Sequence, residues 1–178
     1  MPRPCVFFDR DGIVNASPGP AAYVETPDAF HLLPAFVEAL RVVTERDWAA
    51  VLITNQRGVH LGRMTEDDLA AIHLKLIGLL DEEGLGLDGI YACTEGDNAH
   101  PDRKPNPGLL LRAARDLDLD LPRSWMIGDS ERDIEAGRRA GCATTVRVSP
   151  KGTSTAATWR VDGMDEVPGL LDRELGRG

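Results

Sequence analysis

The chain has 178 residues, a length that fits a single domain over residues 1–178 with a hydrophobic core of its own. Its formal net charge is −9 and no run of Lys or Arg stands out, which disfavours nucleic acid and anionic membrane surfaces as partners. Three widely spaced cysteines, no secretory signal and no apolar run near the ~20 residues of a membrane span indicate a reduced, cytoplasmic protein, and we expect a monomer.

Short β-rich runs alternate with amphipathic helical stretches along the chain. In order, we predict a strand over Cys5–Phe8, a long loop to about Pro34, a helix over Ala35–Arg46, a strand over Ala50–Ile53, a helix capped by Thr65 and ending near Glu83, a strand over Gly89–Ala92, a helix with Pro107 at its first position, a strand over Trp125–Ile127, a helix over Ile134–Ala140, a strand over Thr144–Val148, an edge strand over Thr158–Val161 and a helix over Met164–Leu175. This alternation predicts a parallel sheet with helices on both faces.

Polar residues follow nearly every predicted strand at its carboxyl end. The four sets are Asp9-Arg10-Asp11-Gly12, Thr54-Asn55-Gln56, Arg103-Lys104-Pro105, and Gly128-Asp129 with Asp133. In parallel α/β sheets, ligands bind beyond the carboxyl ends of the strands. Each set alone is a weak signal, but four sets at one edge of one sheet indicate a functional site.

The acidic residues of the first and last sets indicate a cation site. Asp9 follows an apolar run and should be partly buried, and Asp11, two residues later, can point the same way. Neighbouring carboxylates repel each other unless a cation or a shared proton offsets the charge. Asp129 can instead cap the helix that follows, and Asp133 can be an exposed acid of its first turn. We favour a functional role for both, with a hard dication such as Mg²⁺ as the ion.

Lys104 and Thr54 supply the opposite polarity. An ammonium group, a hydroxyl and loop amides can donate to phosphate oxygens that a metal leaves free. The alternatives are an ordinary exposed lysine before Pro105 and a β-branched strand residue. The company of the other motifs favours a functional role for Lys104 and Thr54.

The four motifs, in this order, resemble those of the haloacid dehalogenase (HAD) phosphatases, in the branch of heptose 1,7-bisphosphate phosphatases and histidinol-phosphate phosphatases. Three stretches look closer to the heptose enzymes: Tyr23-Val24-Glu25, Thr54-Asn55-Gln56-Arg57-Gly58 with Gly62 and Thr65, and Leu87-Asp88-Gly89-Ile90-Tyr91. The resemblance covers the chain from about Val6 to Leu171. It implies an α/β, HAD-like Rossmannoid three-layer sandwich with a parallel sheet of order 5-4-1-2-3 and no large cap domain.

The resemblance also implies a role for each matched residue. Asp9 is the nucleophile, and Asp11 protonates the leaving alcohol and then deprotonates the attacking water. Mg²⁺ is held by Asp9, Asp129 and the backbone carbonyl of Asp11, with Asp133 supporting its water shell. The residues expected to bind the phosphoryl group or the substrate are Arg10, Thr54, Asn55, Arg57, Arg103 and Lys104. We therefore expect removal of the 7-phosphate of D-glycero-D-manno-heptose 1,7-bisphosphate through an aspartyl phosphate on Asp9.

The sequence departs from this branch at one place. Many members bind a structural zinc before the Lys-Pro motif through three Cys and one His. Here Cys93 matches the first ligand, but residues 94–102 supply no further cysteine, and His100 is their only histidine. Because one Cys and one His cannot complete a tetrahedral site, we predict that structural zinc is absent.

Other functions compete with this one. Histidinol phosphate would call for an acidic contact at the entrance, whereas a second phosphate calls for basic ones, and Arg57, Arg63 and Arg103 favour the bisphosphate. A polynucleotide 3′-phosphatase is disfavoured by the acidic charge. A scaffold that only binds a phosphorylated ligand would be expected to lose a catalytic carboxylate, yet Asp9, Asp11 and Asp129 are all present.

Two histidines and the three tryptophans outside the motifs are assigned to packing. His31 and His73 have apolar neighbours in the sequence. The three tryptophans, Trp48, Trp125 and Trp159, are expected to be core or half-buried aromatics.

Overall fold

The protein is built on one six-stranded parallel sheet, in a computed structural model that describes residues 1–176. The strands are β1 (Cys5–Phe8), β2 (Ala49–Asn55), β3 (Gly89–Cys93), β4 (Trp125–Gly128), β5 (Thr144–Val148) and β6 (Trp159–Val161). Their order is β3-β2-β1-β4-β5-β6. Read from the other edge, the first five strands follow the order 5-4-1-2-3, so the predicted fold class is confirmed and β6 extends the sheet beside β5.

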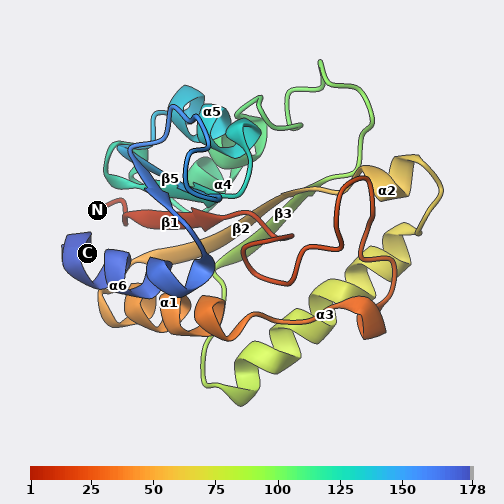
Figure 1. Cartoon of the computed structure of the whole chain (residues 1–178), viewed down its shortest axis with the longest axis horizontal. Helices are drawn as coiled ribbons and strands as arrows, with labels where there is room; N and C mark the ends of the chain where they lie inside the picture. Colours follow the sequence, from red (N-terminus) through yellow and green to blue (C-terminus); the bar gives the residue numbers. More distant parts are fainter. Residues whose placement is uncertain (177–178) are drawn as a thin grey trace.

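Helices cover both faces of this sheet. They are α1 (Pro34–Glu45), α2 (Arg57–His60), α3 (Glu66–Glu82), α4 (Gly108–Asp116), α5 (Glu131–Ala140) and α6 (Val167–Glu174). Helices α1, α3 and α6 lie on one face and α4 and α5 on the other (Figure 1). The short helix α2 was not predicted, and Pro107 precedes α4 as its N-cap instead of occupying its first position.

The two-residue period of β1 shows how the sheet separates two cores. Val6 and Phe8 pack with α1, α3 and α6, whereas Cys5 and Phe7 pack with α4 and α5. All four side chains are fully buried, as expected for a central parallel strand. The near-continuous apolar sequence of β1 is therefore explained by a helical layer on each side.

Loops and the short helix α2 gather at the carboxyl end of the sheet, opposite the chain termini (Figure 1). Residues 9–33 and 94–107 run mainly as turns and extended loops. Neither forms a separate cap domain within the described residues 1–176. The end of the sheet where the motifs lie is thus covered by loops and the short helix α2.

Local signals in the sequence fix the ends of two helices. Thr65 and Asp68 form a capping box at the start of α3, with Asp68 N donating to Thr65 Oγ1 over 3.0 Å. Helix α5 ends at Gly141, whose φ of 92° is left-handed, a conformation that glycine adopts without strain.

Two packing assignments were wrong. Trp48 and Trp125 are buried as expected, but Trp159 on the edge strand β6 is 42% exposed. His31 is exposed as well, because its loop runs along the surface before α1. Among the described residues, no helix is long and apolar enough to cross a membrane.

Replacing Phe36 by Ala should destabilise the fold. Phe36 of α1 is fully buried and its ring meets that of Phe8 edge-to-face, with centroids 5.1 Å apart. The cavity and lost contacts should lower the free energy of unfolding by about 3–5 kcal/mol, as measured by urea denaturation. Leu74→Ala is the matched control, because Leu74 is 68% exposed and its loss should have little effect. Equal effects of the two variants would contradict this packing.

Candidate active site

Strand register brings three of the four motifs to one level of the sheet. Phe8 pairs with Leu52 of β2 and with Ile127 of β4, and Asp9 N donates to Ile127 O over 2.9 Å. The residues that follow these pairs therefore lie next to one another at the ends of β2, β1 and β4. This is the physical basis of the site predicted from the strand ends.

Three carboxylates converge at this edge. Asp9, Asp129 and Asp133 each offer an oxygen, and these oxygens lie within 4.8 Å of one another. Asp9 follows β1, whereas Asp129 and Asp133 come from the end of β4 and the first turn of α5. The side chain of Asp11 is not one of the three, which is compatible with the expected role for its backbone carbonyl.

Lys104 lies inside this cluster and is almost completely buried. Its Nζ donates to Asp133 Oδ1 over 2.6 Å, to Asp9 Oδ1 over 2.7 Å and to Ile53 O over 3.0 Å, so all three ammonium hydrogens have acceptors. Burial alone would lower the pKa of Lys104, but Asp133 and Asp9 outweigh it and raise the pKa above its ordinary value. The ammonium group is therefore permanently charged.

One ammonium does not neutralise the cluster. With all three carboxylates ionised (−3), one ammonium (+1) leaves a charge of −2, which a divalent cation would balance. Burial and Asp133 raise the pKa of Asp9 to about 8, although Lys104 acts in the opposite direction. Burial and Asp133 likewise raise the pKa of Asp129 to about 6. The charge and the carboxylate donors both fit Mg²⁺.

Two glycines are required by the close packing of these acids. A Cβ on Gly12 would lie 2.4 Å from Asp129 Oδ2, and the φ of Gly12 is +86°. A Cβ on Gly128 would lie 2.2 Å from the Cβ of Asp133. A side chain at either position would force the carboxylates apart.

Helix α5 fixes Asp133. Ser130 is the N-cap of the helix, and its backbone N and Oγ both donate to Asp133 Oδ2, over 3.1 and 2.9 Å. The other oxygen of Asp133 receives Lys104. Asp133 is therefore a buried acid and not an exposed one, and Ser130, not Asp129, caps the helix.

Asp11 is held by side chains around it. Asn15 Nδ2 donates to Asp11 Oδ1 over 2.9 Å, and Gln56 Nε2 lies 3.3 Å from Oδ2. Arg10, predicted to bind substrate, has no exposed surface and pairs with Asp11 over 3.0 Å. We therefore propose a positioning role for Arg10, because its guanidinium lies behind Asp11. Asn15 and Gln56 were not among the predicted site residues, since an isolated amide carries no such signal in the sequence.

The second motif supports the third. The side-chain amide of Asn55 donates to Lys104 O over 3.1 Å and accepts from Lys104 N over 3.0 Å, which fixes the backbone that carries the ammonium. The Thr54 hydroxyl accepts from Gln56 Nε2 over 2.8 Å, so its own hydrogen is left to donate. The peptide bond between Lys104 and Pro105 is cis.

Arg103 orders the loop over residues 94–102, where the sequence predicts no structural zinc. Its Nε donates to Asn98 Oδ1 over 3.1 Å and its Nη1 to Glu95 O over 3.2 Å. Asn106 Nδ2 donates to Asn98 O and to His100 O. These contacts show how the loop can be ordered by hydrogen bonds, and the absence of zinc stays a prediction.

The acids and Lys104 open into a cavity of about 320 Å³. It is lined by Asp9, Asp11, Asn55, Lys104, Ser130, Arg132 and Asp133. Arg132, which the sequence analysis did not single out, is exposed in the first turn of α5. Burial, Arg132 and Arg57 all lower the pKa of Arg103, which indicates that three guanidinium groups lie in one region.

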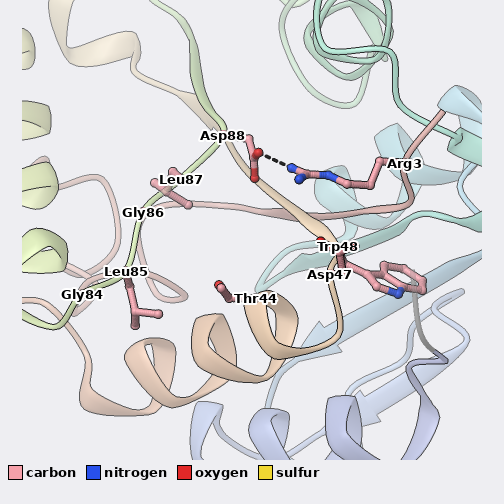
Figure 2. A pocket seen from close by; sticks show the side chains of 9 residues that line it. All are labelled: Arg3, Thr44, Asp47, Trp48, Gly84, Leu85, Gly86, Leu87 and Asp88. Atoms are coloured by element: carbon pink, nitrogen blue, oxygen red, sulfur yellow. Dashed lines mark hydrogen bonds and ion pairs between the residues drawn. The ribbon is translucent and has the colours of Figure 1, made fainter. Parts of the chain in front are cut away.

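A second cavity, of about 330 Å³, lies at the opposite end of the sheet, near the starts of the central strands (Figure 2). Arg3 and Asp88 point toward each other across it and form an ion pair. Asp88 also accepts from Ala50 N over 2.8 Å. Arg3 and Asp88 thus neutralise each other, in contrast to the charged groups around Lys104.

Comparison with known proteins agrees with this geometry. A HAD-hydrolase-like family model matches residues 102–159. The D-glycero-α-D-manno-heptose-1,7-bisphosphate 7-phosphatase of Burkholderia mallei is 34% identical over 170 residues, covering 89% of this chain and 86% of that protein. The chain belongs to this phosphatase family. The β-anomer 7-phosphatase of Bordetella bronchiseptica is 38% identical over 153 residues, covering 85% of this chain and 84% of that protein.

Solved structures of the family have the same fold. The D,D-heptose 1,7-bisphosphate phosphatase of B. bronchiseptica, in complex with magnesium and phosphate, matches with a TM-score of 0.85 and 32% identity, covering 97% of this chain and 99% of that chain. A HAD-like phosphatase structure from Mesorhizobium loti matches with a TM-score of 0.84 and 31% identity, covering 100% of this chain and 90% of that chain. The predicted HAD relationship is thereby confirmed.

Metal-free protein should lose stability as the pH rises. Asp9 and Asp129 have raised pKa values when folded, so the folded chain retains protons that the unfolded chain releases, and the free energy of unfolding should fall between about pH 4 and pH 8. Mg²⁺ should oppose this trend because it favours the ionised carboxylates. Urea denaturation in EDTA and in Mg²⁺ across this range measures both effects. In Asp129→Asn the pH dependence should be weaker, and an unchanged dependence would contradict the assignment.

Proposed function

We propose that the chain is a Mg²⁺-dependent phosphomonoesterase that removes the 7-phosphate of D-glycero-D-manno-heptose 1,7-bisphosphate. The observation that carries this proposal is the buried cluster of Asp9, Asp129 and Asp133 around Lys104, at the mouth of a cavity with arginines nearby. Relatives with this activity cover most of the chain. Their names include both anomers, so the anomer preference is not part of the proposal.

In the proposed mechanism, each of these side chains has one role. An oxygen of Asp9 attacks phosphorus, the bond between phosphorus and the sugar oxygen breaks, and Asp11 gives its proton to that oxygen. Asp11 then takes a proton from water, whose oxygen attacks the aspartyl phosphate and releases inorganic phosphate and Asp9. Lys104, beside Asp9, offers positive charge near the transferred phosphoryl group. The Thr54 hydroxyl offers a hydrogen-bond donor to it.

Residues Asp9 and Asp129 would hold Mg²⁺ through their carboxylates, and Asp11 through its backbone carbonyl. When bound, the ion supplies charge neutralisation for an anionic nucleophile and an anionic ester. Asp133 has both carboxylate oxygens engaged by Lys104 and Ser130. Asp133 therefore positions Lys104, and it would support the water shell of the ion.

Substituting Asp9 by Asn should abolish turnover without unfolding the protein. Asn cannot form the aspartyl phosphate, while Lys104 keeps its bond to Asp133. We expect turnover to fall by at least about 10³-fold, measured as phosphate release from a sugar phosphate in Mg²⁺. A thermal melt should show a folded variant. If Asp9→Asn turned over substrate like the unchanged protein, Asp9 would not be the nucleophile. If the unchanged protein itself showed no turnover, a binding scaffold would be favoured.

The second phosphate of the substrate needs cations that are not already paired. Among the described residues, Arg57 and Arg132 form no ion pair with a carboxylate. Both are exposed, and Arg132 lines the cavity. Arg63, in contrast, pairs with Glu25 over 3.0 Å. Free guanidinium groups favour a bisphosphate over histidinol phosphate, whose amine they would repel.

Arg132→Gln should weaken binding of a bisphosphate selectively. Loss of one charge-assisted contact should raise KM for the heptose bisphosphate by roughly 10-fold, with kcat little changed. The KM of a monophosphate such as p-nitrophenyl phosphate should stay the same. Arg138→Gln is the matched control, because Arg138 lies on the same helix and borders a different cavity. Equal effects on both substrates would argue against a second phosphate near Arg132.

We further propose that the protein works as a single-domain monomer in the cytoplasm, without nucleic acid or membrane partners. The net charge of −9 supports the absence of nucleic acid and membrane partners, because it repels both kinds of anionic surface.

A substrate panel that includes both heptose bisphosphate anomers and histidinol phosphate, ranked by kcat/KM, tests the assignment of the substrate.

A further inference from the structure

The guanidinium group of Arg10 lies fully buried behind Asp11. Its Nε donates to Asp11 Oδ1 over 3.2 Å, and its Nη2 lies 3.0 Å from Oδ1 and 3.3 Å from Oδ2. Arginine is almost never fully buried unless its charge and donors are paired. The remaining donor group, Nη1, lies 3.4 Å from Nε2 of His73.

His73 reaches Arg10 from helix α3, 63 positions along the chain. Because arginine can only donate, Nε2 of His73 must be the acceptor and Nδ1 must carry the proton. Burial and the charge of Arg10 lower the pKa of His73 to about 4, so the ring is neutral at neutral pH. Neutral histidine is the form that can accept this hydrogen bond.

Two amides complete the surroundings of Asp11. Asn15 Nδ2 and Gln56 Nε2 hold its carboxylate from the loop after β1 and from the end of β2. Arg10 is the only charged group bound to this carboxylate in the described part of the chain. The plane of the Arg10 guanidinium is fixed at one end by Asp11 and at the other by His73.

We propose that His73 is a positioning residue for proton transfer by Asp11: it holds Arg10, and Arg10 holds the Asp11 carboxyl group in line with the leaving oxygen. This inference rests on the proposed function, in which Asp11 gives its proton to the sugar oxygen as the phosphorus–oxygen bond breaks. His73 does not touch the substrate, and it acts only through Arg10.

A merely structural role can be separated from this one by changing the leaving group. A sugar alkoxide leaves poorly without a proton, whereas p-nitrophenolate leaves without one, so only the sugar phosphate depends strongly on Asp11 as an acid. The parameter kcat/KM reports the steps up to release of the alcohol. A general loss of active protein lowers kcat/KM equally for both substrates.

The test compares His73→Leu, His73→Gln and the exposed control Leu74→Gln in the intact protein with Mg²⁺. His73→Leu should lower kcat/KM for a sugar phosphate about tenfold, a part of the 10²–10⁴-fold effect typical of general acid catalysis. The value for p-nitrophenyl phosphate should change less than about twofold. His73→Gln should recover most of the loss because its amide oxygen can accept from Arg10, and Leu74→Gln should change neither value.

Arg10→Lys gives a second route to the same answer if His73→Leu does not fold. Lysine keeps the charge but cannot bind Asp11 and His73 together, so the sugar phosphate should again be affected selectively. Equal loss on both substrates, no loss, or no recovery in His73→Gln would overturn the inference while leaving the phosphatase activity in place. An unchanged protein that hydrolyses neither substrate would overturn the proposed function and this inference with it.

Discussion

The ammonium group of Lys104 is the contact on which the whole site depends. It draws together Asp9 after β1, Ile53 O in β2 and Asp133 in α5, and it does so from the loop after β3. Three parallel strands and a helix are thus tied through one cation in a nearly dry environment. An unpaired ammonium or carboxylate would be strongly unfavourable there. Its charge offsets part of the repulsion among the acids, and a side chain at Gly12 or Gly128 would collide with Asp129 or Asp133.

The supporting contacts around Lys104 explain why its geometry is fixed. Asn55 binds both backbone polar groups of Lys104, and Ser130 holds Asp133 from the other side. Asn55, Lys104 and Asp133 belong to motifs that follow three different strands. Their contacts act together, because Asn55 fixes the backbone of Lys104 and Lys104 in turn binds Asp133.

Much of the fold and the centre of the site could be predicted from the sequence, because both follow from local patterns. Apolar runs ending in polar residues define the strands, and parallel pairing then places Asp9 and Asp129 together. Residues that act through tertiary contacts carry no such pattern. From the sequence, His73 is one more residue of an amphipathic helix, and only the structure places Arg10 beside it. The edge position of β6 was predicted, but the sequence did not show that the Trp159 side chain would be left 42% exposed there.

The loop over residues 94–102 limits what Arg103 can offer to a substrate. Arg103 holds this loop through Asn98 and Glu95, and the side chain of Arg103 is only 4% exposed. A guanidinium used in this way has fewer donors left for a substrate. For the second phosphate of the proposed substrate we therefore expect cations that the loop does not engage, and Arg132 lines the cavity. In this chain, Arg103, which the motif predicts to bind substrate, is therefore bound mainly to the loop. Arg132, which lies outside the motifs, lines the cavity instead.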